Sequence, residues 1–220
     1  MQKTGVGFSN KHLENELLNQ KVVATDATVV TVNGKQNYIR NFSIKNSVVY
    51  HAMGGKSIEA LKGLYFLKHY TGILLHDHET ALYHFGTDHA ECNVHIIRYL
   101  RKNTEETGNA WSGEMSALLC EMNRERKELL GQGFPSFPPA ILREYEEKYF
   151  SLIRKGEAEN KTTRHKYAKK EEKTLLNRMD KYSHNHLLFL HDFSVPFDDN
   201  ISERDLRKAK NRQKMAGGFR

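Results

Sequence analysis

The stretch that decides the fold is KVVATDATVVTV, residues 21–32, in which β-branched residues surround a single acid, Asp26. Valine and threonine favour strands, and the Asn-Gly pair at 33–34 is a strong signal for a tight hairpin turn. Residues 36–45 (QNYIRNFSIK) would pair with the first strand, and residues 47–53 (SVVYHAM) would supply a third. The sequence therefore predicts a three-stranded antiparallel meander with a carboxylate inside its first strand.

A second apolar run, GILLHD, ends at Asp77. Between the meander and this run, residues 57–70 have apolar side chains at helical spacing, with Ser57 as the expected N-cap. A helix in this position allows a crossover, so the short strand at 73–77 can lie beside the strand of Asp26. Ligand sites in such sheets collect at the carboxyl ends of strands. The expected fold class is α/β with a mixed sheet.

The rest of the chain reads as mostly helical. Residues 90–106 are expected to start as a strand or tight turn and to continue as a helix, and residues 184–192 (HNHLLFLHD) to form a strand or a buried helix turn. Helices are predicted at 111–130, 140–155, 165–182 and 201–215. We interpret residues 107–182 as a helical insertion within a single domain that covers residues 1–220.

Positive charge is concentrated in parts of the chain. The net charge is +7 and the mean hydropathy is −0.70. Residues 204–220 hold seven Lys/Arg and one Asp, and residues 161–173 hold six Lys/Arg and two Glu. Clustered cations favour an anionic partner such as nucleic acid. For 204–220 we favour that interpretation, whereas for 161–173 we favour a solvated helix face.

Several classes of protein find no support in the sequence. The two cysteines, Cys92 and Cys120, form no disulfide framework, and no apolar segment has the length of a membrane span. The sequence contains no GxSxG nucleophile motif and no phosphate-binding Gly-rich loop. Cys92-x-x-His95 could be half of a zinc site, but a packed structural pair is the simpler interpretation. A cytoplasmic protein without a membrane partner is expected.

Three acids stand in contexts that suit a metal site, and each has an ordinary alternative. Asp26 could lie on the wet face of an edge strand. Asp77 could cap a helix, lie in a loop after a strand or, with its His and Glu neighbours, bind a transition metal. Glu203 could form a capping box with Asn200. Taken together, carboxylates from two strand ends and one helix start can converge on hard cations such as Mg²⁺.

The last predicted helix places one acid and three bases on one face. Glu203, Arg207, Lys210 and Lys214 recur at intervals of four, three and four residues. A helix that presents a metal-binding carboxylate followed by a row of phosphate contacts would have this pattern. An exposed i,i+4 ion pair between Glu203 and Arg207 would have it too.

Three stretches carry a resemblance to a known family: DATVVTVNGK around Asp26, GILLHDHETALYHFGTDHAECNVHIIRYL around Asp77, and NHLLFLHDFSVPFDDNISERDLRKAKNRQKMAGGFR around Glu203. They resemble the catalytic core of bacterial DDE transposases of the insertion sequence 66 family, over nearly all of the chain. The resemblance implies a ribonuclease-H-like fold with a helical insertion before the last catalytic helix. By position, Asp26, Asp77 and Glu203 would be the catalytic, metal-binding triad. Cys92 and His95 match a Cys-x-x-His element that follows the second aspartate in several groups.

The resemblance also implies cofactors and partners. Two Mg²⁺ ions, for which Mn²⁺ can substitute, would serve hydrolysis and strand transfer at transposon ends. DNA, both transposon end and target, would be the partner, with Arg207, Lys210 and Lys214 on its phosphates. A homo-oligomer in the DNA complex and association with the bacterial nucleoid follow from the same resemblance.

The chain departs from the family in length. Members usually carry DNA-binding and zinc-binding regions ahead of this core and continue beyond its end, so a truncated core is expected. The metal-dependent chemistry of the family is not excluded, because all three acids are present. The alternatives are a non-catalytic remnant that binds DNA and a ribonuclease-H-like nuclease without strand transfer.

Overall fold

The structure is a computed structural model that describes the backbone of residues 6–216 and the side chains of residues 12–216. The chain divides into two compact units. The sheet unit contains the chain up to Glu91 and again from Asp199, and the helical unit is Cys92–Asp198. The mixed α/β composition confirms the predicted fold class, while the ribonuclease-H-like assignment stays a prediction.

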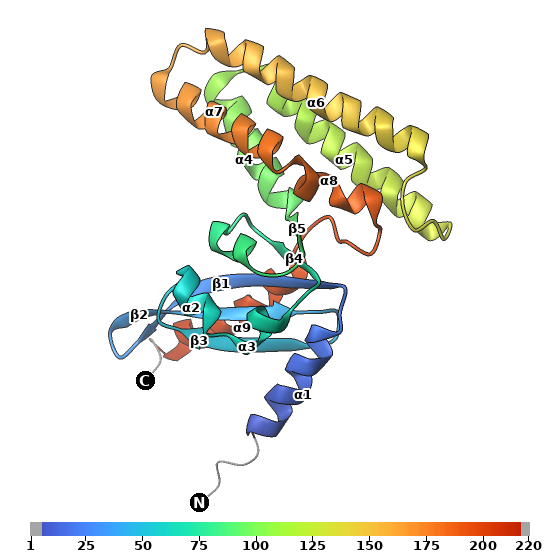
Figure 1. The fold of residues 1–220 in the computed structure, drawn as a ribbon. Helices are drawn as coiled ribbons and strands as arrows, with labels where there is room; N and C mark the ends of the chain where they lie inside the picture. Colours follow the sequence, from blue (N-terminus) through green and yellow to red (C-terminus); the bar gives the residue numbers. More distant parts are fainter. Residues whose placement is uncertain (1–5, 217–220) are drawn as a thin grey trace, which may run out of the picture. The chain divides into compact units, whose positions relative to one another are not determined.

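The sheet unit is built on a mixed sheet with the strand order β3-β2-β1-β4-β5 (Figure 1). The first three strands form the predicted antiparallel meander, and β4 and β5 run parallel to β1. The strands are β1 (Val22–Val32), β2 (Lys35–Ser43), β3 (Val48–Met53), β4 (Ile73–His76) and β5 (Asp88–Glu91). Strand β1 is central in the sheet, but it pairs with β4 only over Val22–Ala24, so Asp26 lies just beyond the part of β1 that has a neighbour on each side.

The hairpin between β1 and β2 turns where the sequence predicts it. Asn33 and Gly34 have φ angles of 50° and 74°. A two-residue turn with positive φ at both positions matches the right-handed twist of the paired strands, and Asn-Gly adopts it at little cost. This turn sets the register in which Asp26 lies opposite Asn41.

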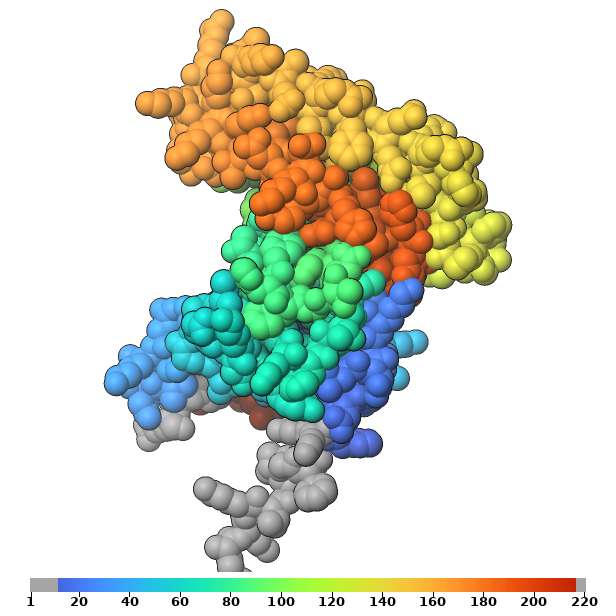
Figure 2. Space-filling model, viewed as in Figure 1, coloured from blue at the N-terminus to red at the C-terminus, as the bar shows by residue number. Residues whose placement is uncertain are grey.

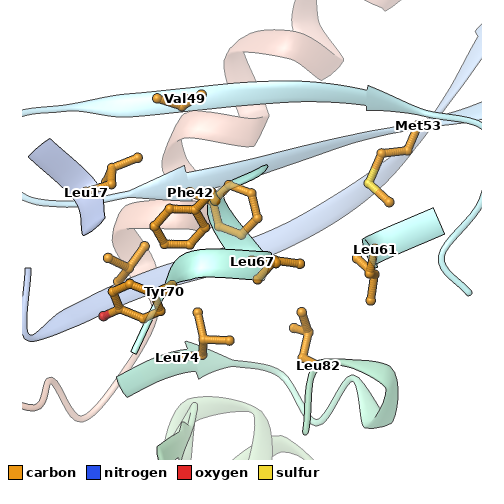
Figure 3. Close-up of a cluster of buried hydrophobic side chains, with 11 residues drawn as sticks. Leu17, Phe42, Val49, Met53, Leu61, Leu67, Tyr70, Leu74 and Leu82 are labelled. Atoms are coloured by element: carbon orange, nitrogen blue, oxygen red, sulfur yellow. The ribbon is translucent and has the colours of Figure 1, made fainter. Parts of the chain in front are cut away.

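Helices cover both faces of this sheet. On one face, Phe42 packs in a buried cluster with Val23, Leu17 and Leu74 (Figure 3). That cluster receives side chains from α1 (Val6–Leu18), α2 (Ile58–Lys62) and α3 (Tyr65–His69). Neighbouring residues of a strand point to opposite faces, so Asn41 points away from the cluster. It contacts α9 (Asn200–Ala216), which therefore lies on the other face.

The predicted helix at 57–70 is two short helices. Ser57 is the N-cap of α2, as predicted, and its hydroxyl accepts a hydrogen bond from the N–H of Ala60. The helix ends at Gly63, and Leu64 has extended φ and ψ angles of −86° and 118° before α3 begins. Glycine is a poor helix former, which accounts for the end at Gly63. The second helix buries Phe66 and Leu67.

The helical unit consists of five helices among its described residues: α4 (Asn93–Thr107), α5 (Ala110–Gly131), α6 (Pro139–Thr162), α7 (Lys166–Lys181) and α8 (Ser183–His191). It is wider than the predicted insertion at 107–182, because α4 and α8 belong to it. The HNHLLFLHD stretch is helical rather than a strand, and its apolar residues Leu187–Leu190 are buried. Whether one domain with an insertion is the right description stays a prediction.

Close packing in the helical unit centres on Trp111, which is fully buried. Gly156 of α6 faces it, and a Cβ at this position would come within 2.7 Å of the Trp111 ring and 2.6 Å of Leu176. The missing side chain therefore lets α6 approach α5 and α7.

A buried carboxylate, Glu172, joins the helices of this unit. It accepts hydrogen bonds from both amide and ring N–H groups and from a hydroxyl. The donors are Asn103, Asn109, Trp111, Asn160 and Thr163, at distances of 2.7–3.1 Å. Four distinct segments, α4, α5, α6 and α7, therefore meet at one side chain.

The remaining expectations concern cysteines and membranes. Cys92 is buried just before α4 and Cys120 is exposed, and no disulfide joins them in the described part of the chain. The Nε2 atom of His95 lies 3.0 Å from Nη1 of Arg98. Within residues 6–216, no helix is long and apolar enough to cross a membrane.

Candidate active site in the sheet unit

Asp26 lies in β1, and Asp77 follows directly after the adjacent parallel strand β4, at the matching position. Ala24 of β1 and Leu75 of β4 are register partners, and each acid follows its partner by two residues. A step of two residues keeps a side chain on the same face of a sheet. Both carboxylates therefore belong to the face that α9 covers, and each is partly buried.

Asn41 attaches the start of α9 to this position. Its side-chain oxygen accepts from the N–H of Asp26 at 3.0 Å, and its amide nitrogen donates to the carbonyl of Ser202 at 2.9 Å. Asn41 itself is fully buried. Because Ser202 precedes Glu203, this amide links the strand that carries Asp26 to the helix turn that carries Glu203.

A fourth acid, Asp199, completes what we call the acid cluster: Asp26, Asp77, Asp199 and Glu203. Burial raises the pKa of Asp199 to about 8. The nearby charges of Asp26, Glu203 and Asp77 add to this rise. A hydrogen bond of 2.9 Å from the Ser202 hydroxyl opposes it. The carboxylates predicted from the sequence thus lie close enough together to act on one buried acid.

Two cations lie beside the acid cluster. Burial raises the pKa of Asp26, while the N–H of Ala27 and the charges of Lys56 and Arg40 lower it. Arg40 is fully buried and pairs with Glu79 at 2.5 Å. Lys56 lies 3.8 Å from the same carboxylate. Glu79 therefore neutralises much of the positive charge of Arg40 and Lys56. The acid cluster keeps a net negative charge.

The donor set suits hard divalent cations. Mg²⁺ binds carboxylate oxygens, usually from one or two acids with additional water. The acid cluster offers such oxygens on a partly buried surface. Its carboxylates repel one another, and a bound cation would reduce this repulsion. The residues present therefore fit a Mg²⁺ or Mn²⁺ site.

The raised pKa of Asp199 predicts a dependence of stability on pH. Between the unfolded pKa near 3.8 and the folded value of about 8, the folded protein keeps a proton that the unfolded chain releases. The free energy of unfolding should therefore fall as pH rises through this range, by up to about 1.4 kcal/mol per pH unit, and level off above it. Asp199→Asn should flatten the dependence.

The measurement is urea denaturation in EDTA from pH 5 to pH 9. Glu59→Gln is the control, because Glu59 is exposed on α2 in the same unit. An Asp199→Asn profile parallel to that of the unaltered protein would contradict the assignment of the proton to Asp199.

Of the ordinary alternatives for Asp77, the helix N-cap is wrong, whereas its position in a loop directly after a strand matches the structure. The short 3₁₀ helix after it, η1 (Thr80–His84), has Glu79 and not Asp77 as its N-cap residue. The neighbouring histidines do not share one ion with it either. His76 points to the opposite face, where its Nε2 atom lies 3.2 Å from Nδ1 of His89.

The alternatives for Glu203 have a mixed outcome. Helix α9 begins at Asn200, so its N-cap is Asp199, whose carbonyl accepts the N–H of Glu203 at 3.3 Å. Asn200 is therefore the first helical residue and not the N-cap, so the predicted capping box between Asn200 and Glu203 is wrong. The i,i+4 ion pair is present, with 3.6 Å between Arg207 and Glu203. The Arg207 side chain is 71% exposed, so this pair adds little stability and leaves the carboxylate available.

The predicted phosphate contacts lie on the solvent side of α9. Arg207, Lys210 and Lys214 are all exposed. The opposite side of the helix holds buried Leu206 and Asp205, which face the sheet. The row of cations thus starts one turn after Glu203 and extends away from the acid cluster.

Three residues of the site were not predicted from the sequence: Asn41, Asp199 and Ser202. Asp199 carried a local signal, since it stands one turn before Glu203 at a helix start. Asn41 carried none, because an Asn in a strand gives no indication that it will connect to residue 202. Its role depends on a contact between residues 161 positions apart.

Residues 7–220 match a protein-family model described as Transposase IS66 family. Comparisons with curated proteins and with solved structures gave no match. The matched residues contain the whole acid cluster and the cation row of α9. Because the family model covers nearly the entire chain, the chain belongs to the IS66 family of transposases.

Proposed function

We propose that this chain catalyses DNA transposition by metal-dependent phosphodiester hydrolysis and strand transfer at transposon ends. Membership of the family supports a role in transposition with DNA as the substrate. The observation that carries the chemistry is the acid cluster, in which three carboxylates from β1, the end of β4 and the start of α9 act on buried Asp199.

The fold supports the same proposal. A ribonuclease-H-like catalytic domain over residues 1–220 would have an antiparallel meander extended by parallel strands, with acids at strand ends. The sheet unit has this order, and the helical unit enters the chain between β5 and α9, before the last acid. We therefore assign the helical unit as an insertion in such a domain.

Asp26, Asp77 and Glu203 are the residues that would hold the metal. Two Mg²⁺ or Mn²⁺ ions bound there supply charge stabilisation at a phosphodiester and lower the pKa of a bound water. The chain itself contributes orientation: Asn41 holds Asp26 and α9 together, and the buried pair of Arg40 and Glu79 holds the segment after Asp77. Fixed ligands of this kind reduce the reorganisation needed during reaction.

Arg207, Lys210 and Lys214 would hold the DNA backbone beside the acids. Each phosphate contact releases counterions, so binding should weaken steeply with salt. Because the cation row begins one turn from Glu203, a strand held along α9 would reach the acid cluster at the start of the helix.

The test is a pair of assays with the unaltered protein. In the first, a labelled duplex taken from DNA flanking the gene is incubated with Mg²⁺, with Mn²⁺ and with EDTA, and cleavage is followed on a gel. In the second, the same end is supplied pre-cut with a free 3′-hydroxyl, and joining to a target plasmid is measured. Cleavage and joining that both require metal support the proposal.

The other outcomes separate the alternatives. Cleavage without joining indicates a nuclease that does not transfer strands. Salt-sensitive DNA binding without cleavage in either metal indicates a non-catalytic DNA-binding protein and overturns the proposal.

A further inference from the structure

The helical unit has a basic surface hollow that contains no residue of the acid cluster. We call it the α6–α7 corner. It is lined by Arg164, His165, Lys166, Tyr167 and Lys170 and has a volume of about 540 Å³. In Figure 1 this corner is the turn that joins α6 to α7 at one end of the helical unit. Figure 2 shows this orange part of the chain at the surface.

Charge at the corner is not neutralised locally. Residues 161–170 hold five Lys/Arg and no acid. Within the described residues, Arg164, Lys166 and Lys170 take part in no ion pair, whereas nearby Lys155 and Lys173 pair with glutamates at 2.5 and 2.9 Å. An ordinary solvated helix face mixes both signs, as the rest of α6 does. The corner therefore favours an anionic partner.

An aromatic ring lies among these cations. Tyr167 is 58% exposed, although Ala168 beside it is buried. Cations interleaved with an exposed ring are typical of surfaces on which the bases of a single strand stack while its phosphates are neutralised. An acidic protein segment would match the charge but would leave the ring without a planar partner.

Hydrogen bonds within the helical unit fix the backbone of the α6–α7 corner. Thr163 donates to Glu172 at 3.0 Å, and the Asn160 amide donates to the carbonyl of Lys169 at 2.9 Å. The ammonium group of Lys169 in turn donates to the carbonyl of Lys161 at 2.8 Å. The backbone on both sides of the turn is thus fixed before any partner binds, which reduces the entropy lost on binding.

We propose that the α6–α7 corner binds a single-stranded stretch of DNA, with its phosphates on Arg164, Lys166 and Lys170 and a base stacked on Tyr167. The choice of DNA over another polyanion rests on the proposed function. The binding itself does not, because it requires neither the acid cluster nor a metal.

The test uses the full chain in EDTA and a fluorescent 20-nucleotide single strand, with anisotropy measured at several salt concentrations. A variant with Arg164→Gln, Lys166→Gln and Lys170→Gln should bind roughly 10–100-fold more weakly near physiological salt. The slope of log affinity against log salt should also decrease by about 2, as expected for three lost contacts to a single strand.

The matched control removes three positive charges elsewhere on the helical unit, by Lys127→Gln, Arg143→Gln and Arg154→Gln. These side chains are exposed and form no ion pair in the described part of the chain. Because the change in net charge is the same, a loss confined to the corner variant isolates the site. Equal losses in both variants would overturn the proposal.

Substitutions of Tyr167 distinguish base stacking from electrostatic attraction alone. Tyr167→Ala should weaken binding about 5- to 100-fold, and Tyr167→Phe should preserve it, because stacking needs the ring and not the hydroxyl. Unchanged binding by Tyr167→Ala, or tighter binding of a duplex of equal length, would reject a single-strand site. None of these measurements depends on cleavage. A negative result would reject the single-strand site without affecting the catalytic proposal, which the cleavage and joining assays test.

Discussion

Replacing Asp77 with Asn should lower metal-dependent strand cleavage by on the order of a thousandfold. The substitution keeps the size of the side chain but removes one charge from the proposed ligand set. Metal ions contribute several kcal/mol of charge stabilisation in such reactions, and about 4 kcal/mol corresponds to this factor. Asp77 is partly buried at the end of β4, so the fold should tolerate the change. The measurement is initial rates of cleavage with saturating Mg²⁺.

DNA binding decides how this result is interpreted. The Asp77→Asn variant should bind DNA about as tightly as the unaltered protein, because the predicted phosphate contacts are on α9. Asp180→Asn is the matched control, since Asp180 is exposed on α7 and loses the same charge. Undiminished cleavage by Asp77→Asn would remove this acid from the catalytic site.

Replacing Glu172 with Gln should destabilise the helical unit by about 3 kcal/mol or more. The amide has nearly the shape of the carboxylate, so no cavity forms. It can no longer accept every bond that Glu172 accepts, and at least one buried donor loses its partner. An unsatisfied buried group costs about 1–3 kcal/mol, and the remaining bonds lose the strength that the charge lends them. The midpoint of urea denaturation should fall by on the order of 1–2 M.

The matched control is Glu171→Gln, which alters the exposed neighbour of Glu172. It should leave the midpoint nearly unchanged. An equal midpoint for both variants would show that the buried network contributes no stability of its own.

The same network predicts the effect of acid. Burial alone would raise the pKa of Glu172, but hydrogen bonds from Asn109, Trp111 and other donors outweigh burial and hold the pKa below its ordinary value of 4.5. The unfolded chain therefore binds this proton more readily. The contribution of Glu172 to stability should be complete above about pH 4.5 and should be lost as pH falls through the lowered folded value. Glu172→Gln should lack this acid dependence.

Much of the sheet could be predicted from local signals. The Asn-Gly turn at 33–34 determines the register of its hairpin, because both positions accept positive φ. The β-branched residues of β1 and the apolar run before Asp77 also indicate strands, because both signals lie within a few consecutive residues. The sequence predicts one helix at 57–70, yet Gly63 is a local signal for a helix end, and the first helix ends there. Only the tertiary structure shows that a second helix follows Leu64 and buries Phe66.

The HNHLLFLHD stretch shows another limit. A short apolar run fits a buried strand and a buried helix equally well by pattern. In the structure it is α8, and buried His186 accepts a hydrogen bond from Asn93 on its carbonyl at 3.0 Å. The choice between strand and helix depends on the partner surface, which in this case is made of helices rather than of a sheet.

By itself, the sequence determined the strands, most helices and the three acids that the candidate site is built on, because turns, caps and apolar periodicity act over a few residues. Only the tertiary structure decided that Asp199 joins these acids and that Asn41 attaches α9 to β1. It also decided that Glu172 is a buried junction and that the cations around Tyr167 remain unneutralised. Each of these depends on which distant groups come within hydrogen-bonding or Coulombic range, and local pattern carries no information on such distances.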